Sequence, residues 1–302
     1  MKTVLLTGAS GMLGRYALDQ ISKVAKRVIC LSRTRPVNLP ANAVWYAFDL
    51  INRYSLDDID VFSEDDADEF WHVGALLPGA NITDDVMFDA NVRSVQWLAQ
   101  YALKKRLAFR FVSGSTVYAN PYAMDIREDD DLSPNGFGGF YGSSKFFAEK
   151  ILEYYAQQGL RVTILRPSSI YGSGISANKL IARYLTQAMN DQEIIITPPL
   201  DQSFNLIFAE DVAVALALAS ERDITGTFNI AGFNYAIRDI AETCIKVAAA
   251  GKLVVDNVET DAQPKPVTSL FDLDDSKIRR ALGYDHRTTL HDGLMSMARE
   301  TA

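Results

Sequence analysis

The chain has 302 residues, of which 48% are hydrophobic, and a formal net charge of −8. This length and composition allow a full hydrophobic core, and the negative charge argues against a general affinity for nucleic acid or for an anionic membrane surface. No stretch of about 18 apolar residues occurs, so we expect no transmembrane helix. The two cysteines, Cys30 and Cys244, suggest no disulfide framework, which favours a reducing, cytoplasmic location.

Acidic residues gather in two stretches, Asp57–Glu69 and Glu128–Asp131. We interpret both as solvated loops and helix ends. The three histidines, His72, His286 and His291, lack the spacing of metal ligands. We therefore predict no metal site.

The first half of the chain alternates short β-rich runs with longer helical patterns. Strands that are apolar almost throughout and separated by helices are typical of a parallel sheet covered on both faces. We therefore predict an α/β fold with a doubly wound, Rossmann-type sheet. The expected strands are Thr3–Thr7, Arg27–Leu31, Val44–Ala47, Glu69–Val73, Phe109–Ser113 and Val162–Leu165, and the expected helices are Met12–Lys23, Asp84–Lys105 and Tyr141–Gln158.

The pattern is less regular after Pro167, which predicts a smaller C-terminal lobe for substrate. We assign residues 1–166 and about 204–232 to the dinucleotide-binding domain, and 167–203 and 233–302 to the substrate lobe. The expected helices here are Lys179–Asn190, Glu210–Ser220 and a last one after Leu290, and the expected strands are Ile194–Thr197, Asn205–Phe208 and Thr227–Ile230.

A glycine-rich turn follows the first expected strand. Gly8, Gly11 and Gly14 are spaced G-x-x-G-x-x-G and lead into a helix, with Ser10 and Met12 between them. Glycine allows a tight turn and a close approach to a pyrophosphate, and the free N–H groups of the helix end favour the anion. The alternative is a plain βα turn, but the position in the first βα unit favours dinucleotide binding.

The end of the second strand bears on the choice between NAD and NADP. An acidic residue there would bind a ribose diol, whereas arginine suits a 2′-phosphate. Ser32, Arg33 and Arg35 stand at this point, and Arg15 follows the glycine turn. We therefore favour NADP over NAD, the alternative being arginines that merely solvate a loop.

Tyr141 and Lys145 begin an expected helix four residues apart, so that both side chains lie on one face. A phenol is a poor proton donor and acceptor at neutral pH, and a nearby ammonium lowers its pKa. The pair therefore suggests proton transfer at a bound cofactor. The alternative is the start of an amphipathic helix with a surface lysine.

Taken together, these motifs make the chain resemble the extended short-chain dehydrogenase/reductase family of NAD(P)-dependent epimerases, dehydratases and sugar-nucleotide reductases. The resemblance covers nearly the whole length. It rests on TGASGMLG at 7–14, Asp49-Leu50, His72–Ala75, Asn91, Val117-Tyr118, YGSSK at 141–145, Arg166–Gly172, Ala209–Ala213, Phe228–Ile230 and Asp274–Ile278.

The resemblance implies a role for several residues. Tyr141 would exchange a proton with the substrate oxygen, and Lys145 would tune it and hold the nicotinamide ribose. The remaining positions would bind the cofactor or support the fold: Asp49 and Leu50 flank the adenine, Gly74 and Ala75 line the central stretch, Pro167 and Ser169 hold the nicotinamide, and Asn91, Asp211 and Asn229 are structural. The family also implies a homodimer formed through the helices expected at 84–105 and 141–158.

The sequence departs from the family pattern at Gly114. The family usually has Ser or Thr here, whose hydroxyl binds the reacting oxygen. Ser113 and Ser115 flank the glycine, and either could take this role, with Ser115 slightly favoured. The alternative is that both hydroxyls satisfy backbone groups at the strand end.

Other departures bear on the reaction. The Asp-Glu pair of the family's 4,6-dehydratases is replaced by Ser115 and Thr116, which argues against that activity. The arginine that many nucleotide-sugar enzymes place before Asp211 is also missing. Asn178 stands where several such enzymes bind the diphosphate, with Arg183 nearby, although a helix N-cap explains Asn178 equally well.

The function predicted from the sequence is the NADPH-dependent reduction of a carbonyl, with a keto group of a nucleotide-activated sugar as a candidate. A nucleotide-sugar epimerase is the close alternative. An NADP-binding regulatory protein with an impaired site is a third, because of Gly114. The expected partner is a small-molecule substrate, and neither nucleic acid nor membrane is expected.

Overall fold

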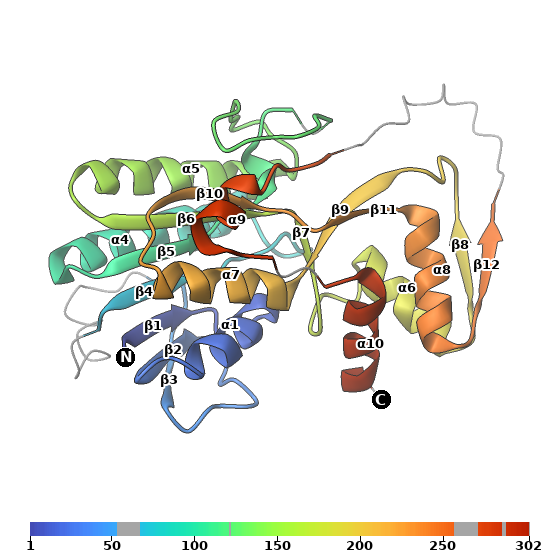
Figure 1. The fold of residues 1–302 in the computed structure, drawn as a ribbon, viewed down its shortest axis with the longest axis horizontal. Helices are drawn as coiled ribbons and strands as arrows, with labels where there is room; N and C mark the ends of the chain where they lie inside the picture. Colours follow the sequence, from blue (N-terminus) through green and yellow to red (C-terminus); the bar gives the residue numbers. More distant parts are fainter. Residues whose placement is uncertain (53–66, 121, 257–270, 286–287, 302) are drawn as a thin grey trace.

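A parallel sheet of seven strands forms the centre of the protein (Figure 1). The computed structural model describes residues 1–52, 67–120, 122–256, 271–285 and 288–301. Apolar residues fill these strands, so both faces of the sheet need cover. The strand order is β10-β6-β5-β4-β1-β2-β3, with β1 at Thr3–Thr7, β2 at Arg27–Ser32, β3 at Ala43–Ala47, β4 at Glu69–His72, β5 at Ala108–Val112, β6 at Arg161–Pro167 and β10 at Gly226–Ile230.

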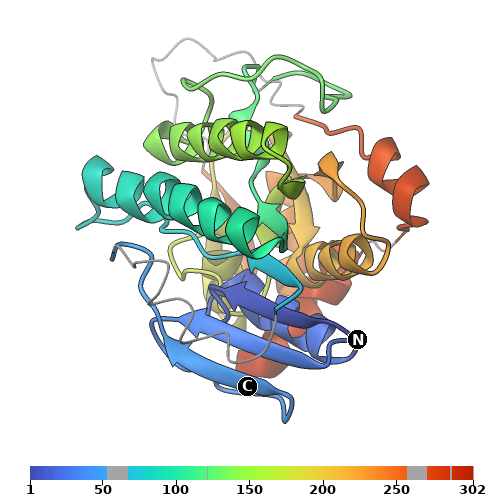
Figure 2. The same ribbon diagram turned by 90° about the vertical axis from the view of Figure 1, so that its left-hand side faces the viewer.

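Helices cover both faces of the sheet, which confirms the predicted doubly wound α/β fold (Figures 1 and 2). On one face, α1 (Met12–Ser22) and α7 (Ala209–Glu221) share a core with alternate residues of β1. On the other, α4 (Ser94–Lys105) and α5 (Gly139–Gln157) pack on the intervening residues. The smaller elements are α3 at Asp84–Phe88, a π-helical turn η1 at Asp89–Arg93, a 3₁₀ turn η2 at Ser115–Val117 and α9 at Ser276–Leu282.

A second group of elements packs around its own hydrophobic core, beyond the C-terminal ends of the strands. It contains a three-stranded sheet, β11-β9-β7, and a two-stranded sheet, β12-β8. Four of its elements were not expected from the sequence: β7 (Ser169–Tyr171), β11 (Phe233–Ala236), α8 (Ile237–Ala248) and β12 (Lys252–Val255). The others are α6 at Leu180–Met189, β8 at Glu193–Ile196, β9 at Ser203–Phe208 and α10 at Leu290–Thr301.

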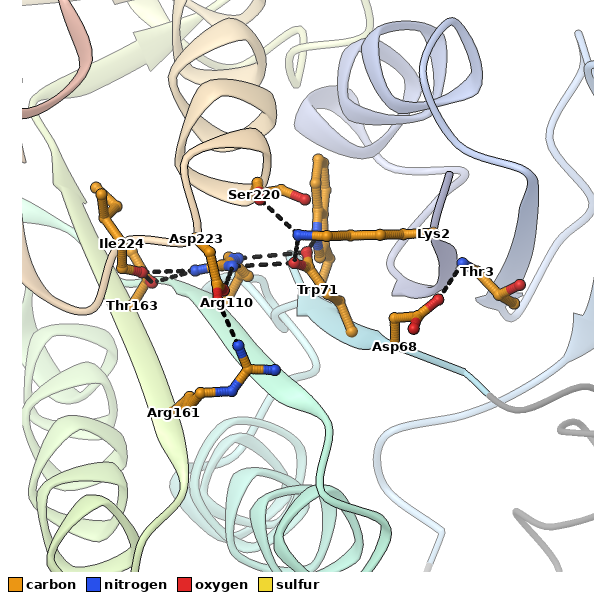
Figure 3. A network of polar contacts seen from close by, with 11 residues as sticks. Lys2, Thr3, Asp68, Trp71, Arg110, Arg161, Thr163, Ser220, Asp223 and Ile224 are labelled. Carbon is orange, nitrogen blue, oxygen red and sulfur yellow. Dashed lines mark hydrogen bonds and ion pairs between the residues drawn. The ribbon is translucent and has the colours of Figure 1, made fainter.

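A charged network crosses the sheet at the amino ends of its strands (Figure 3). Arg110 on β5 is fully buried and binds Glu69 on β4 at 2.9 Å and Asp223 at 2.9 Å. Lys2 binds Glu69 from β1's side, and Arg161 binds Asp223. Together with the bond from Arg110 to the hydroxyl of Thr163 on β6, these pairings join neighbouring strands of the sheet.

This network corrects part of the prediction for the acidic stretches. Glu69 is 1% exposed and is not solvated, because Arg110 and Lys2 compensate its charge inside the protein. Residues 57–66 of the stretch lie outside the described residues. In the second stretch, Asp129–Asp131 are exposed as expected, whereas Glu128 is partly buried and accepts a bond from the backbone N–H of Asn229. No helix in the described part of the chain is long and apolar enough to cross a membrane.

Candidate active site

The glycine turn lies between β1 and α1 and allows very close backbone packing. A Cβ built on Gly14 would lie 1.9 Å from the carbonyl oxygen of Gly8, and one built on Gly8 would lie 2.5 Å from the Cα of Gly74. Gly8 also has a φ of +71°, a conformation that favours glycine. Gly11 caps α1 without a side-chain hydrogen bond, so the helix end presents free N–H groups toward an anion.

A cavity of about 260 Å³ opens next to this turn. Its size, and the glycine backbone that lines one side of it, fit the pyrophosphate and neighbouring groups of a dinucleotide. It brings together fourteen of the residues predicted for the site: Gly8, Ser10, Gly11, Met12, Gly14, Ser32, Arg33, Asp49, Leu50, Gly74, Ala75, Ser113, Tyr141 and Lys145. Seven others do not line it: Arg15, Arg35, Ser115, Pro167, Ser169, Asn178 and Arg183.

Several apolar residues that line the cavity were not predicted from the sequence. Each lies within one or two positions of a residue that the sequence singled out, so extending each motif would have found them. They are Leu13, Leu31, Phe48, Ile51, Val73, Leu76, Leu77, Ala90, Val112 and Ile170.

The three arginines predicted near the cofactor occupy different environments. Arg33 is exposed and lines the cavity. Arg35 is also exposed but stands outside the lining. Arg15 points to the C-terminal helix, where its guanidinium lies 2.9 Å from the carboxylate of Glu300. The hydroxyl of Thr34 donates to that of Ser10 at 3.0 Å, which ties the arginine loop to the glycine turn.

Tyr141 and Lys145 lie in the first turns of α5, in the wall of the cavity. Lys145 is 3% exposed, and its ammonium donates to the carbonyl of Val112 at 2.9 Å. Burial lowers the pKa of Lys145 to about 8, although the charge of Glu149 partly opposes this. The ammonium also lies 5.8 Å from the centre of the Tyr141 ring.

The pKa of Tyr141 does not shift in the direction that the sequence predicts. Removal of the phenol from water raises it to about 12. The nearby ammonium was expected to lower it, but Lys145 directs its hydrogen bond to Val112, and desolvation of the phenolate dominates. Tyr141 is therefore protonated at neutral pH.

His72 lies at the end of β4, within reach of the charge of Lys145. It is buried, and its Nδ1 lies 2.7 Å from the hydroxyl of Thr7. Burial and the charge of Lys145 lower the pKa of His72 to about 3, so the ring is neutral. No group of three or more metal-ligating side chains occurs among the described residues.

The residues expected to be structural connect separate segments. Asn91 accepts from the backbone N–H of Leu76 at 2.7 Å and donates to its carbonyl at 2.9 Å and to Ser144 at 3.1 Å. It thus joins the cavity wall to the helix that carries Tyr141. Asp211 binds Thr288, and Asn229 binds Tyr118, both away from the cavity lining.

The segment around Gly114 follows β5. Ser113 is 4% exposed, lines the cavity, and its hydroxyl has no hydrogen-bond partner among the described residues. Ser115 is 5% exposed and begins the 3₁₀ turn without lining the cavity. The geometry thus places Ser113, rather than the slightly favoured Ser115, next to the cofactor cavity.

The two predicted substrate residues lie on the second group of elements. Asn178 is exposed, and the N-cap of α6 is Lys179, without a side-chain bond. The helix-cap interpretation of Asn178 is therefore wrong, because the helix begins one residue later. Arg183 is exposed on α6, with its guanidinium 5.5 Å from the centre of the Tyr184 ring.

Comparisons with known proteins agree with this geometry. The model of the NAD dependent epimerase/dehydratase family matches residues 4–231. The chain is 30% identical over 239 residues to the PKS-NRPS hybrid synthetase cheA of Chaetomium globosum; the match covers 71% of the chain but 5% of that much longer relative. It is 27% identical over 252 residues to the dTDP-4-dehydro-6-deoxy-D-allose reductase of Streptomyces bikiniensis, covering 76% of each.

Solved structures share the fold. The UDP-glucuronic acid 4-epimerase of Bacillus cereus in complex with NAD superposes with a TM-score of 0.81 over 99% of both chains, at 20% identity. The fold and the glycine turn define a Rossmann-type protein. The chain belongs to the NAD dependent epimerase/dehydratase family.

Proposed function

We propose that the protein is an NADPH-dependent oxidoreductase that reduces a keto group of a nucleotide-activated sugar. The observation that carries this proposal is the position of Tyr141 and Lys145 in the wall of the same cavity as the glycine turn. A bound nicotinamide cofactor would supply the hydride. The chain must then supply a proton, hold the carbonyl and exclude water.

Tyr141 is the proposed proton donor to the substrate oxygen. Its raised pKa keeps it protonated at neutral pH, and the nearby positive charge of Lys145 stabilises the phenolate that forms when the proton leaves. Ser113 lines the cavity and carries a buried, unpartnered hydroxyl, and it is the proposed hydrogen-bond donor beside the reacting groups. Ser115 is the less favoured candidate.

Arg33 supports the choice of NADP. It is exposed at the rim of the cavity, after a strand that ends in Ser32 instead of an acidic residue. A guanidinium there can form a bidentate contact with a 2′-phosphate. Arg35 is two residues away in the sequence and would add positive charge near the 2′-phosphate. Arg15 is a weaker candidate for binding this phosphate, because it forms an ion pair with Glu300.

The substrate class rests on the similarity to the dTDP-4-dehydro-6-deoxy-D-allose reductase. Residues 167–203 and 233–302, together with β9 of the second group of elements, form the proposed substrate lobe, with Asn178 and Arg183 as candidate contacts to a diphosphate. The test mixes the protein with NADPH and sugar nucleotides that carry a keto group, starting with dTDP-4-dehydro-6-deoxy-D-allose. Stoichiometric NADPH oxidation with alcohol formation is expected.

An epimerase is the second candidate, because a structural neighbour is an epimerase in complex with NAD. It would use the same tyrosine and lysine with no net change in the cofactor. Conversion of UDP-glucose or UDP-glucuronic acid to its C4 epimer without NADPH oxidation would favour this candidate over the reductase.

We also propose a cytoplasmic homodimer. The two cysteines are free and buried, which fits a reducing compartment. Phe147 and Tyr154 on α5 are 38% and 58% exposed, an apolar surface that a second copy could cover. A solution mass equal to one chain of 33.4 kDa would contradict the dimer.

A further inference from the structure

The ammonium of Lys145 lies in a part of the protein that excludes most of the solvent. The residue is 3% exposed, and the carbonyl of Val112 accepts a hydrogen bond from its ammonium. Burial of an amine favours its neutral form, so the groups around the ammonium decide whether it keeps its proton. The proposed support of the Tyr141 phenolate requires the charged form.

An aromatic ring lies next to this ammonium. The Nζ atom of Lys145 is 4.7 Å from the centre of the Phe111 ring on β5, closer than the 5.8 Å to the centre of the Tyr141 ring. Phe111 is 1% exposed and does not line the cofactor cavity. The face of an aromatic ring carries partial negative charge and attracts a cation, most strongly where both are removed from water.

The titratable groups on α5 and β6 leave this contact without a free negative charge. Glu149 lies one turn further along α5 and raises the pKa of Lys145. Its carboxylate is bound by Arg166 of β6 at 2.7 Å, so the guanidinium offsets much of its effect. The phenol of Tyr141 is protonated at neutral pH. The Phe111 ring is therefore an important source of attraction for the ammonium.

His72 approaches the same ring from β4. The rings of His72 and Phe111 are stacked, with 5.7 Å between their centres and 13° between their planes. Burial and the charge of Lys145 lower the pKa of His72 to about 3, so the imidazole is neutral. Its Nδ1 lies 2.7 Å from the hydroxyl of Thr7. Among the described residues, Lys145 is thus the one cation over the Phe111 ring.

We propose that Phe111 is a positioning residue, whose ring holds the ammonium of Lys145 beside Tyr141 in its charged form. Phe111 lies outside the cavity lining and acts through the lysine. The interaction is electrostatic, and no bond forms or breaks at the ring. Its consequence for carbonyl reduction rests on the proposed reductase function, whereas its effect on the protonation of Lys145 does not.

The test measures the protonation of Lys145 by an NMR titration of the protein labelled with ¹⁵N at the lysine Nζ atoms. Lys145→Met identifies the signal. In Phe111→Leu, which replaces the ring by an aliphatic side chain, the titration midpoint of Lys145 should fall by about one pH unit. With dTDP-4-dehydro-6-deoxy-D-allose and NADPH, the alkaline fall in kcat should move by the same amount, and kcat at pH 6 should change less than about twofold.

Phe109→Leu is the matched control. Phe109 is two residues earlier on β5, belongs to the same buried core as Phe111, and has its ring centre 6.1 Å from that of His72. Loss of either ring leaves a cavity in this core, so both variants should have a lower Tm. The midpoint of Lys145 should move in Phe111→Leu and stay unchanged in Phe109→Leu.

A second variant removes the charge distribution of the ring and keeps its shape. Pentafluorophenylalanine incorporated at position 111 lacks the negative ring face, because fluorine withdraws electrons from the ring. This protein should show the same downward shift of the Lys145 midpoint as Phe111→Leu, with a Tm closer to that of the unaltered protein. Should Phe111→Leu fail to fold, the fluorinated protein alone decides the question.

An unchanged Lys145 midpoint in the fluorinated protein would overturn the inference, because any shift in Phe111→Leu would then come from lost packing. An equal shift in Phe109→Leu would overturn it as well. A lower midpoint in Phe111→Leu and in the fluorinated protein, together with absence of turnover in the unaltered protein, would support the effect on Lys145 and overturn the proposed function alone.

Discussion

The ammonium of Lys145 donates a hydrogen bond to the backbone carbonyl of Val112 across a distance of 2.9 Å. Val112 is the last residue of β5, so this bond fixes α5 to the carboxyl end of the strand, where the cavity opens. Because the lysine is almost fully buried, its charge is screened little by solvent. It can therefore influence both Tyr141 and a bound ribose.

Replacement of Lys145 by methionine should reduce kcat/KM for carbonyl reduction by at least about 10²-fold, because the phenolate of Tyr141 loses its nearby positive charge. Steady-state kinetics with NADPH and the sugar nucleotide measure this effect. Lys150→Met is the control, since Lys150 is an exposed lysine on the same helix that pairs with Glu153. A similar loss in both variants would argue against a specific role for Lys145.

The rate of reduction should depend on pH above neutrality. Lys145 has a pKa of about 8, so its ammonium is present below this value and is lost as the pH rises through it. Tyr141, with a pKa of about 12, stays protonated over the same range. We expect kcat to be level between about pH 6 and 8 and to fall above about 8. Lys145→Met should lack this fall, and a profile that decreases toward low pH instead would contradict the assignment.

Arg33 should discriminate between the two cofactors. Arg33→Ala should raise the Kd for NADPH about tenfold or more, equivalent to about 1.4 kcal/mol, and change the Kd for NADH less than about twofold. Titration of cofactor fluorescence measures both constants. Arg222→Ala, an exposed arginine at the end of α7, should change neither. Tighter binding of NADH than of NADPH by the unaltered protein would contradict the choice of NADP.

The buried carboxylate of Glu69 should make the protein sensitive to acid. Burial alone would raise its pKa, but hydrogen bonds and charge from Arg110, together with Lys2 and Trp71, lower it to about 2 from an ordinary 4.5. Its contribution to stability is complete above about pH 4.5 and is lost as the pH falls toward about 2. A shift of this size corresponds to about 3 kcal/mol of unfolding free energy.

Urea unfolding of Glu69→Gln should therefore show a loss of about 3–5 kcal/mol at pH 7, because Arg110 is left partly uncompensated in the interior. The loss should shrink as the pH falls below about 4.5. Glu153→Gln, at an exposed ion pair with Lys150, should cost less than about 1 kcal/mol. Equal losses of unfolding free energy in the two variants would mean that the buried network stabilises the protein no more than an exposed ion pair does.

Most of the central sheet was predictable from the sequence. Its inner strands are almost wholly buried, so an apolar run such as Val4–Leu6 or Val28–Leu31 marks them within a residue or two. The glycine turn was equally clear from its spacing and its place after β1, and the structure explains two of its glycines by close backbone packing, Gly8 against Gly74 and Gly14 against Gly8.

The charged network was not predictable in this way. Arg110 and Glu69 stand in strand segments 41 residues apart, and only the pairing of β4 with β5 brings them together. The hydrogen bond from Lys145 to the carbonyl of Val112 likewise depends on the packing of α5 beside the end of β5. Such features arise from tertiary packing, which local patterns do not contain.

One helix that was not predicted, α8, does have a recognisable pattern of apolar residues in the sequence. Ile237, Ile240, Ala241 and Cys244 have the spacing of a buried helical face, and the last three are buried in α8. In contrast, the π-helical turn at Asp89–Arg93 within the predicted helix 84–105 has no marker in the sequence, although it presents Asn91 to Leu76 and Ser144.

The most direct test of the central claim follows deuterium from NADPH that carries two deuterium atoms at C4 of the nicotinamide into the product of dTDP-4-dehydro-6-deoxy-D-allose. The account predicts one deuterium in the product alcohol for each NADPH oxidised, and a loss of this transfer by at least about 10²-fold in Tyr141→Phe. Equal transfer by Tyr141→Phe and the unaltered protein, or conversion of substrate without NADPH oxidation, would contradict it.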